Sequence, residues 1–348
     1  MSRAPWSRAI ERLFPGYFAL VMATGIVSLA AHFLGMEPVA IGLFWINVVA
    51  YAVLWSLTLA RLVLHPKKLA ADLADHARGP GFFTLVAGTS VLGAQFAILL
   101  RELGVAVALW FVGIGLWTLV TYAFFAAVTT KEGKPTLAEG LNGSWLVSVV
   151  ATQSIAMLGC LVAPWFAAPE VPLFVAVAMH LAGFMLYLPL ISLLLYRWLF
   201  FEITPQQLTP PYWINMGALA ISTLTGARLL QATGGSRLLQ DLTPFLRGST
   251  LCFWATATWW IPLLLVLGFW RHVVRRFPLA YDPQYWGMVF PLGMFTVGTV
   301  QVARALELPG LMAVARACVW PALGAWLVVF AGMCVSLVRC AAREGAHG

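Results

Sequence analysis

The first long apolar stretch of the chain covers residues 14–34 and reads FPGYFALVMATGIVSLAAHFL. A helix needs about 20 predominantly apolar residues to cross a bilayer, and this stretch has 21. It is too long for the apolar core of a cleavable signal peptide. The stretch therefore predicts a membrane-spanning helix rather than a leader that is removed.

The composition of the whole chain supports the same conclusion. Of its 348 residues, 61% are apolar and 10% are charged, and the mean hydropathy is +0.87. Soluble proteins are about 45–50% apolar and about 25% charged. This excludes a soluble globular enzyme, a disordered chain and an ordinary nucleic-acid-binding domain, although the net charge is +8. We expect an all-α polytopic membrane protein, with the lipid bilayer as its surroundings and no nucleic-acid partner.

Ten apolar runs predict ten transmembrane helices. They are 14–35, 39–63, 80–100, 104–128, 142–163, 171–199, 211–233, 248–272, 284–305 and 311–338. An even number places both chain ends on one side of the membrane. If that side is cytoplasmic, 15 Lys and Arg residues lie inside and 6 outside, as the positive-inside rule requires. We therefore expect a cytoplasmic segment 1–13, one ten-helix transmembrane domain 14–338 and a cytoplasmic tail 339–348, in the cell (inner) membrane.

The odd-numbered helices of this series begin alike. Each opens with Pro or Asn and places aromatic residues two or three positions later, and the openings are separated by 65, 62, 68 and 73 residues. The openings start at Pro15, Pro80, Asn142, Pro210 and Pro283. Such a period indicates repeated supersecondary units. It predicts five helical hairpins in a quasi-fivefold arrangement, with the odd helices around a central pore and the even helices toward lipid.

One face of the odd helices is expected to line the pore. A helix turns 100° per residue, so positions 7, 11, 15 and 18 after the opening Pro or Asn share a face. Position 7 is Met22, Ala87, Val149, Gly217 and Phe290. Four of these are smaller or more flexible than a phenyl ring. We expect Phe290 to be the main obstruction, with Pro291 bending the helix beside it.

The same face carries polar residues farther along the helices. They are Gln153, Gln95, Arg228, Gln301, Arg101, Gln231 and Arg304. All 13 acidic residues lie in loops or at helix ends. Cation channels and proton-coupled carriers usually need an acid within the membrane. The stripe therefore predicts an anion path, in which Arg228, Arg304 and Arg101 attract anions at the outer mouth and the glutamines line the wall.

Structural interpretations of these residues stay open beside the functional ones. Arg101 and Arg304 lie at helix ends, where long cationic side chains often reach toward the membrane interface. Gln95, Gln153 and Gln301 can each instead join two helices by a hydrogen bond. Phe290 taken alone is typical of core packing. His180 has no acidic or Cys partner in the sequence, which favours a packed, hydrogen-bonded histidine.

The sequence contains no pattern that indicates catalysis. It has no HExxH motif, no paired acids and no Ser–His–Asp grouping at membrane depth, which argues against a membrane enzyme. The five cysteines lack metal-binding spacing, so we expect no metal and no cofactor. A second class of transporter stays open, namely a proton-coupled exporter or exchanger of the same anions. In that case His180 or the protonated substrate carries the proton.

Three motifs carry a resemblance to a known family. They are residues 14–26 of the first stretch, PPYWINMGA at 210–218 and WGMVFPLG at 286–293. Over residues 14–338 the chain resembles the tellurite-resistance/dicarboxylate transporter family, which includes plant slow-type anion channels, malate permeases and sulfite pumps. The resemblance implies five hairpins around a pore, a homotrimer with one pore per subunit, and a small anion such as chloride, nitrate, sulfite, malate or tellurite as substrate. The family's gating phenylalanine precedes the proline of the ninth helix, which is Phe290 here.

Overall fold

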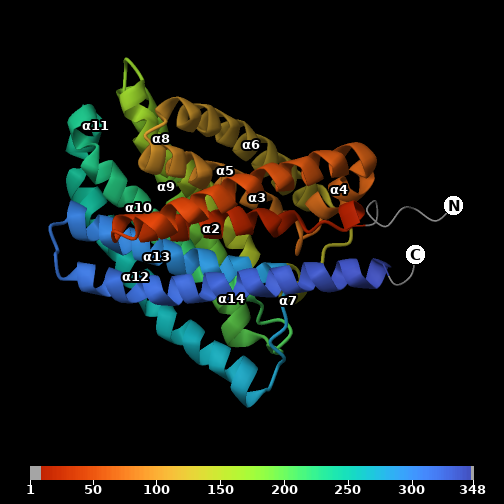
Figure 1. The fold of residues 1–348 in the computed structure, drawn as a ribbon. Helices are drawn as coiled ribbons and strands as arrows, with labels where there is room; N and C mark the ends of the chain where they lie inside the picture. The colour runs from red at the N-terminus through yellow and green to blue at the C-terminus, as the bar shows by residue number, and fades with distance from the viewer. Residues whose placement is uncertain (1–8, 346–348) are drawn as a thin grey trace.

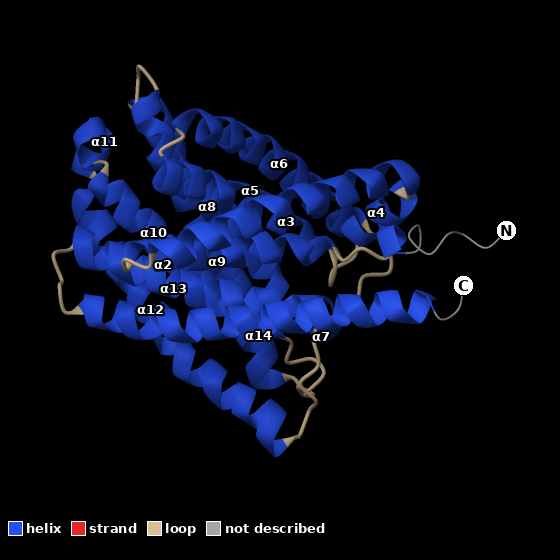
Figure 2. Cartoon of the chain, viewed as in Figure 1, coloured by secondary structure: helices blue, strands red, loops and turns tan. Residues whose placement is uncertain are grey.

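The computed structural model describes residues 9–345, so parts of both predicted terminal segments lie outside the described residues. Within that range the chain folds into helices joined by short loops, without a strand (Figure 2). The long helices run side by side, and η1 and the C-terminal end of α14 lie at the same end of the bundle (Figure 1). The protein is an all-helical polytopic membrane protein, as the composition predicted.

The long helices alternate between an inner and an outer layer. The inner helices, with their opening 3₁₀ turns, are η1 Pro15–Phe18 and α2 Ala19–Phe33, η2 Gly79–Phe82 and α5 Phe83–Gln95, η4 Gly143–Leu146 and α8 Val147–Val162, η6 Pro210–Trp213 and α10 Ile214–Gln231, and η9 Pro283–Tyr285 and α13 Trp286–Ala305. The outer helices are α3 Glu37–Leu64, α6 Leu103–Thr130, α9 Glu170–Phe200, α12 Thr243–Phe269 and α14 Leu311–Gly345.

Shorter elements join or extend these helices. They are α4 Pro66–Leu73, η3 Phe96–Leu100, α7 Leu137–Gly140, η5 Ala163–Trp165, η7 Thr233–Gly235, α11 Arg237–Asp241 and η8 Trp270–Val274. Two of them, η3 and η8, are single π-helical turns that continue α5 and α12. The amphipathic segment α4 lies at the same end of the bundle as the opening turns, and it connects α3 to η2.

Burial separates the two layers. In the inner segment Pro283–Ala305, 89% of the most apolar window is buried, whereas in the outer segment Leu311–Arg339 the share is 17%. Exposed apolar side chains on the outer helices fit a hydrocarbon environment, where unpaired polar groups are costly. The outer helices therefore have the exposed apolar surface that a lipid-facing layer requires.

Nine helices in the described part of the chain are long and apolar enough to cross a membrane. The predicted seventh span, residues 211–233, folds as η6 and α10 over residues 210–231 but is less apolar than the others. Its polar side chains Asn215, Ser222, Thr223 and Thr225 are buried among neighbouring helices, so it needs no apolar surface toward lipid. That this tenth helix also crosses the membrane stays a prediction.

The inner helices contact one another in a closed sequence. Their order is α2, α5, α8, α10, α13 and back to α2, and the opening turns η1, η2, η4, η6 and η9 meet in the same order. Each outer helix packs on the inner helix of its own hairpin and also touches that of the next hairpin. This is the set of neighbours that a ring of five hairpins predicts. A pore along its axis stays a prediction.

Glycines allow the opening turns to meet. A Cβ atom added to Gly81 would lie 2.8 Å from the backbone nitrogen of Gly16, closer than real Cβ atoms approach such an atom. Gly143 lies as closely against the carbonyl of Pro211 in η6. The Pro-Gly and Asn-Gly pairs in the repeated openings thus serve backbone contact between turns, besides starting each helix.

Hydrogen bonds from aromatic side chains join each hairpin to the next. In every case a Tyr or Trp of an outer helix reaches the following inner helix. The pairs are Tyr51 with Thr89 (3.0 Å), Trp117 with Thr152 (2.8 Å), Tyr187 with the Asn215 carbonyl (3.3 Å), Trp254 with Thr299 (3.0 Å) and Trp326 with Thr24 (2.9 Å). The bond from α14 to α2 closes the ring between the last hairpin and the first. Each bond satisfies polar groups that are shielded from water.

We predict that the closing bond contributes to stability as a coupled pair. We compare the single substitutions Trp326→Phe and Thr24→Val with the double substitution. Each single substitution already removes the hydrogen bond, so the double substitution should destabilise the protein by about 1 kcal/mol less than the sum of the two. The measurement is denaturant unfolding of the purified protein in detergent. Trp320→Phe on the same helix is the control, since this side chain is 65% exposed and should change little. Additive effects of the two single substitutions would contradict the prediction.

Candidate functional site

A cavity of about 440 Å³ lies where the opening turns of the inner helices meet. Residues at or next to all five turns line it. They are Phe14, Arg78, Asn142, Ser144, Thr209, Asp282, Pro283 and Gln284. Unpaired N–H groups and the positive ends of helix dipoles gather at helix N-termini. The five helix starts therefore favour negative charge at this end of the ring, where the carboxyl groups of Glu139 and Asp282 also line the cavity.

Arg197 places a fixed positive charge in the wall of this cavity. Its side chain is 3% exposed, and its Nε and Nη2 donate to the carbonyl oxygen of Ala138 at 3.0 and 2.7 Å. Its Nη1 donates to the Tyr212 hydroxyl at the start of the inner helix α10. Among the described residues no carboxylate forms an ion pair with it. In the sequence analysis, Arg197 entered only the count of positive residues that predicted the orientation of the chain in the membrane.

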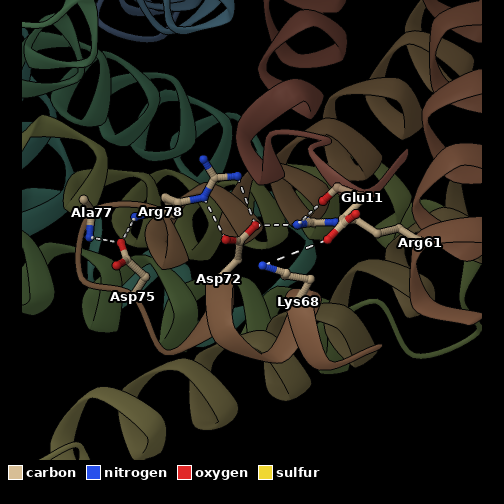
Figure 3. A network of polar contacts seen from close by, with 7 residues as sticks. All are labelled: Glu11, Arg61, Lys68, Asp72, Asp75, Ala77 and Arg78. Carbon is tan, nitrogen blue, oxygen red and sulfur yellow. Dashed lines mark hydrogen bonds and ion pairs between the residues drawn. The ribbon is translucent and has the colours of Figure 1, made fainter. Parts of the chain in front are cut away.

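A second arginine of the cavity wall is held by an ion-pair network (Figure 3). Asp72 lies between two guanidinium groups and accepts from Arg78 Nε and Nη2 at 2.8 and 3.0 Å and from Arg61 Nη2 at 2.6 Å. Arg61 is 3% exposed and also donates to the Glu11 carbonyl at 3.1 Å. The network therefore joins the outer helix α3, the linking helix α4 and the start of the inner segment η2.

Asp72 carries the negative charge of this network. Burial raises the pKa of its carboxyl, but the hydrogen bonds and positive charges of Arg78 and Arg61 lower it more. The net result is a pKa below the ordinary value of 3.8, so Asp72 is ionised throughout the neutral range. Its charge balances much of the positive charge of Arg78 and positions that side chain beside the cavity.

The ring is filled with side chains at the predicted constriction. Met22, Ala87, Val149 and Gly217 are buried, and Phe290 is 1% exposed and does not face the lipid. Pro291 lies against Gly217 of the neighbouring helix, where an added Cβ would be 2.7 Å from its Cγ. The absence of a side chain at Gly217 thus lets α10 and α13 approach beside Phe290. Lining of a pore by these residues stays a prediction.

Two of the predicted wall glutamines bind outer helices. Gln95 Oε1 accepts from Asn47 Nδ2 on α3 at 2.6 Å. Gln153 contacts His180 on α9 twice, through Oε1 to the ring Nδ1 at 2.8 Å and through Nε2 to the carbonyl at 3.1 Å. These are contacts of the helix-joining kind that the sequence left open, and His180 is packed and hydrogen-bonded.

The third glutamine lies in a polar cluster at the other end of the ring. Gln301 Oε1 accepts from Gln231 Nε2 at 3.1 Å, and Gln231 Oε1 accepts from Arg228 Nη1 at 3.1 Å. The guanidinium groups of Arg228 and Arg304 lie 5.6 and 5.3 Å from the centre of one ring, that of Phe33. We name Phe33, Arg228, Gln231, Gln301 and Arg304 the Phe33 cluster.

The Phe33 cluster joins three consecutive members of the ring, α2, α10 and α13. In the described residues neither of its arginines pairs with a carboxylate. Arg101 is exposed at the end of η3 and contributes none of the contacts of the cluster. Of the three arginines predicted at the outer mouth, Arg228 and Arg304 therefore share one aromatic ring, whereas Arg101 lies apart on the surface.

Sequence reasoning missed Arg197, Asp72 and Phe33. A usable signal existed for the first, because each outer helix carries a basic residue near its C-terminal end. These residues are Arg61, Lys131, Arg197, Arg271 and Arg339. Phe33 gives no such signal, since its role depends on two arginines from distant parts of the chain.

Comparison with known proteins gives one family over most of the chain. Residues 12–334 match the model of the SLAC1 family, described as voltage-dependent anion channels. A transporter of Methanocaldococcus jannaschii is 24% identical over 301 residues, covering 83% of this chain and 84% of the relative. A sulfite efflux pump of Trichophyton rubrum is 25% identical over 327 residues, covering 86% and 84%. A membrane protein of Mycobacterium tuberculosis is 36% identical over 160 residues, covering 46% and 81%.

We predict that Asp72→Asn destabilises the protein by about 3 kcal/mol at neutral pH, because it leaves the buried Arg61 without its charge partner. The Asp72 carboxylate stabilises the fold above its ordinary pKa, and this contribution is lost as the pH falls through the lowered folded-state value. The difference from the wild type should therefore be constant between about pH 5 and 8 and shrink below about pH 4. Thermal unfolding in detergent across this range measures it.

Asp75→Asn is the matched control. Asp75 Oδ1 accepts the backbone N–H groups of Ala77 and Arg78 at 2.9 and 2.8 Å, and an asparagine oxygen can accept the same bonds. A loss in Asp75→Asn as large as that in Asp72→Asn would contradict the ion-pair explanation.

Proposed function

The chain belongs to the SLAC1 family of voltage-dependent anion channels, and we propose that it carries small anions passively along the axis of its inner-helix ring. The observation that supports this most is the closed ring of inner helices, with helix N-termini and Arg197 around a cavity at one end and the Phe33 cluster at the other. Arg197 at the first end and Arg228 and Arg304 at the other form no ion pair among the described residues, although Glu139 and Asp282 also line the cavity. The unpaired positive charges favour anions over cations.

Small inorganic anions and C4-dicarboxylates are the proposed substrates. Sulfite belongs to this set because a relative of similar length is named a sulfite efflux pump. We further propose a homotrimer in the cell (inner) membrane with cytoplasmic termini. The ring then presents its cavity to the cytoplasm and the Phe33 cluster to the outside, and Arg228, Arg304 and Arg101 raise the anion concentration there.

Phe290 is the proposed gate of the pathway. Its ring is buried at the level where the inner helices approach each other, and Pro291 follows it in the chain. A proline inside a helix removes one backbone hydrogen bond and permits a bend. Bending of α13 at Pro291 would move the Phe290 ring relative to the axis, which gives the gate a means of opening.

The alternative is proton-coupled export or exchange of the same anions. The efflux activity in the name of the Trichophyton rubrum relative favours it. Anion flux from liposomes under a pH gradient at fixed voltage separates the two mechanisms. Passive conduction predicts a flux that follows the anion gradient and voltage alone, whereas coupling predicts net anion movement driven by the pH gradient.

We predict that Phe290→Ala increases anion flux severalfold, because it removes the largest side chain at the constriction. The measurement is chloride and nitrate efflux from liposomes that contain equal amounts of folded protein. Phe295→Ala is the matched control, since the Phe295 ring stacks on Trp254 of the outer helix α12 and its loss should not open the axis. A folded Phe290→Ala protein with wild-type flux would remove Phe290 as the gate.

We predict that Arg228→Ala lowers anion flux and weakens the preference for anions over cations. The effect should diminish as ionic strength rises, because salt screens the attraction between the mouth and the anion. Reversal potentials in planar bilayers at low and high salt measure both quantities. Selectivity equal to that of the wild type at low salt would exclude a role of Arg228 in attracting anions.

A further inference from the structure

Two hydrogen-bond donors of the Phe33 cluster have no acceptor within the described structure. Arg228 Nε is buried and unpaired, although its Nη1 donates to Gln231. Gln301 Nε2 is likewise buried and unpaired, in a side chain that is 1% exposed, while its Oε1 accepts from Gln231. An unpaired buried donor destabilises the folded protein, because its hydrogen bond to water is not replaced. Both donors belong to one hydrogen-bonded chain of three residues, which makes their shared lack of an acceptor informative.

The cluster also concentrates positive charge. Arg228 and Arg304 share the Phe33 ring, and no carboxylate among the described residues balances either charge. Two like charges on one ring repel each other, and the cation–π attraction offsets only part of this repulsion. An anion bound between the cluster residues would relieve the repulsion and accept from the unpaired donors. A single bound anion would thus both reduce the charge repulsion and supply acceptors for the unpaired donors.

We propose that the Phe33 cluster is a binding site for an oxyanion that enters or leaves the pathway. Arg228 and Gln301 bind its oxygens through their unpaired N–H groups, and Arg304 supplies the second charge. The proposal rests on the proposed anion transport, and it adds that the protein recognises the geometry of its anion at this end. Guanidinium and amide N–H groups point in fixed directions that suit several acceptor oxygens, whereas a spherical halide gains only the charge.

Arg→Lys substitutions separate directed recognition from charge. Lysine keeps the positive charge but loses the planar set of donors. The site predicts that Arg228→Lys and Arg304→Lys weaken binding of nitrate while leaving binding of iodide nearly unchanged. Both probes are monovalent and weakly hydrated, so they differ mainly in shape and in acceptor oxygens. Gln301→Leu should have the same effect as Arg228→Lys without any change in charge.

Binding to the purified full-length protein in detergent is measured by isothermal titration with nitrate and with iodide. We expect the ratio of nitrate to iodide affinity to fall at least fivefold in Arg228→Lys and in Gln301→Leu. Arg247→Lys is the matched control, because Arg247 is an exposed arginine of α12 outside the cluster and should keep the wild-type ratio. Arg304→Lys is a second test at an exposed side chain, where folding is not at risk.

Wild-type ratios in the Arg228→Lys and Arg304→Lys proteins would overturn the site and reduce the cluster to a source of charge. Absence of nitrate binding to the wild type would overturn it as well. Nitrate and iodide efflux from liposomes tests the proposed function separately. Nitrate binding that depends on the cluster in a protein without anion flux would refute the proposed transport and leave the site in place.

Discussion

Polar groups inside a bilayer have no water to bind, and both helix layers of this protein are arranged to meet that constraint. The inner helices carry buried threonines, serines and amides, with Arg228 and Arg304 near their C-terminal ends, and such groups are costly against lipid. They are enclosed by an outer layer of more apolar helices, each of which turns a Tyr hydroxyl or a Trp indole toward an inner helix. The same bonds that satisfy the inner hydroxyls fasten neighbouring hairpins. One set of hydrogen bonds therefore both shields the polar groups of the inner helices and holds neighbouring hairpins together.

The two ends of the ring solve the problem of buried charge differently. At the opening turns, Asp72 forms ion pairs with both Arg78 and Arg61, and a carbonyl and a hydroxyl accept hydrogen bonds from Arg197. At the opposite end, Arg228 and Arg304 share an aromatic ring, and Arg228 Nε has no acceptor. The first end thus holds its arginines through an ion-pair network and uncharged acceptors, with Arg61 Nε left unpaired, whereas the arginines of the second end have no carboxylate partner among the described residues.

Much of this architecture can be predicted from the sequence because the patterns that determine it extend over many residues. Apolar runs predicted the long helices, and the repeated openings predicted which helices form the inner layer. The direction of single polar side chains was harder to predict. A count of positions identifies a common face, but an inner helix has neighbours on all sides, so Gln95 and Gln153 could turn to α3 and α9 instead of the axis. The moderate hydropathy of residues 210–231 has the same origin, since a fully enclosed helix needs no apolar surface.

The bond between Thr24 and Trp326 joins residues 302 positions apart, and it concerns how the protein is made. During translation the first hairpin is synthesised long before the last one. Until the last hairpin is present, one side of α2 lacks its neighbour, and the Thr24 hydroxyl lacks the Trp326 indole. Only the arrival of the final hairpin converts an open arc into a cycle. Contacts of such long sequence separation form late and slowly. A chain that terminates before α14 therefore leaves the ring open, with flanks of α2 and α13 that no outer helix covers.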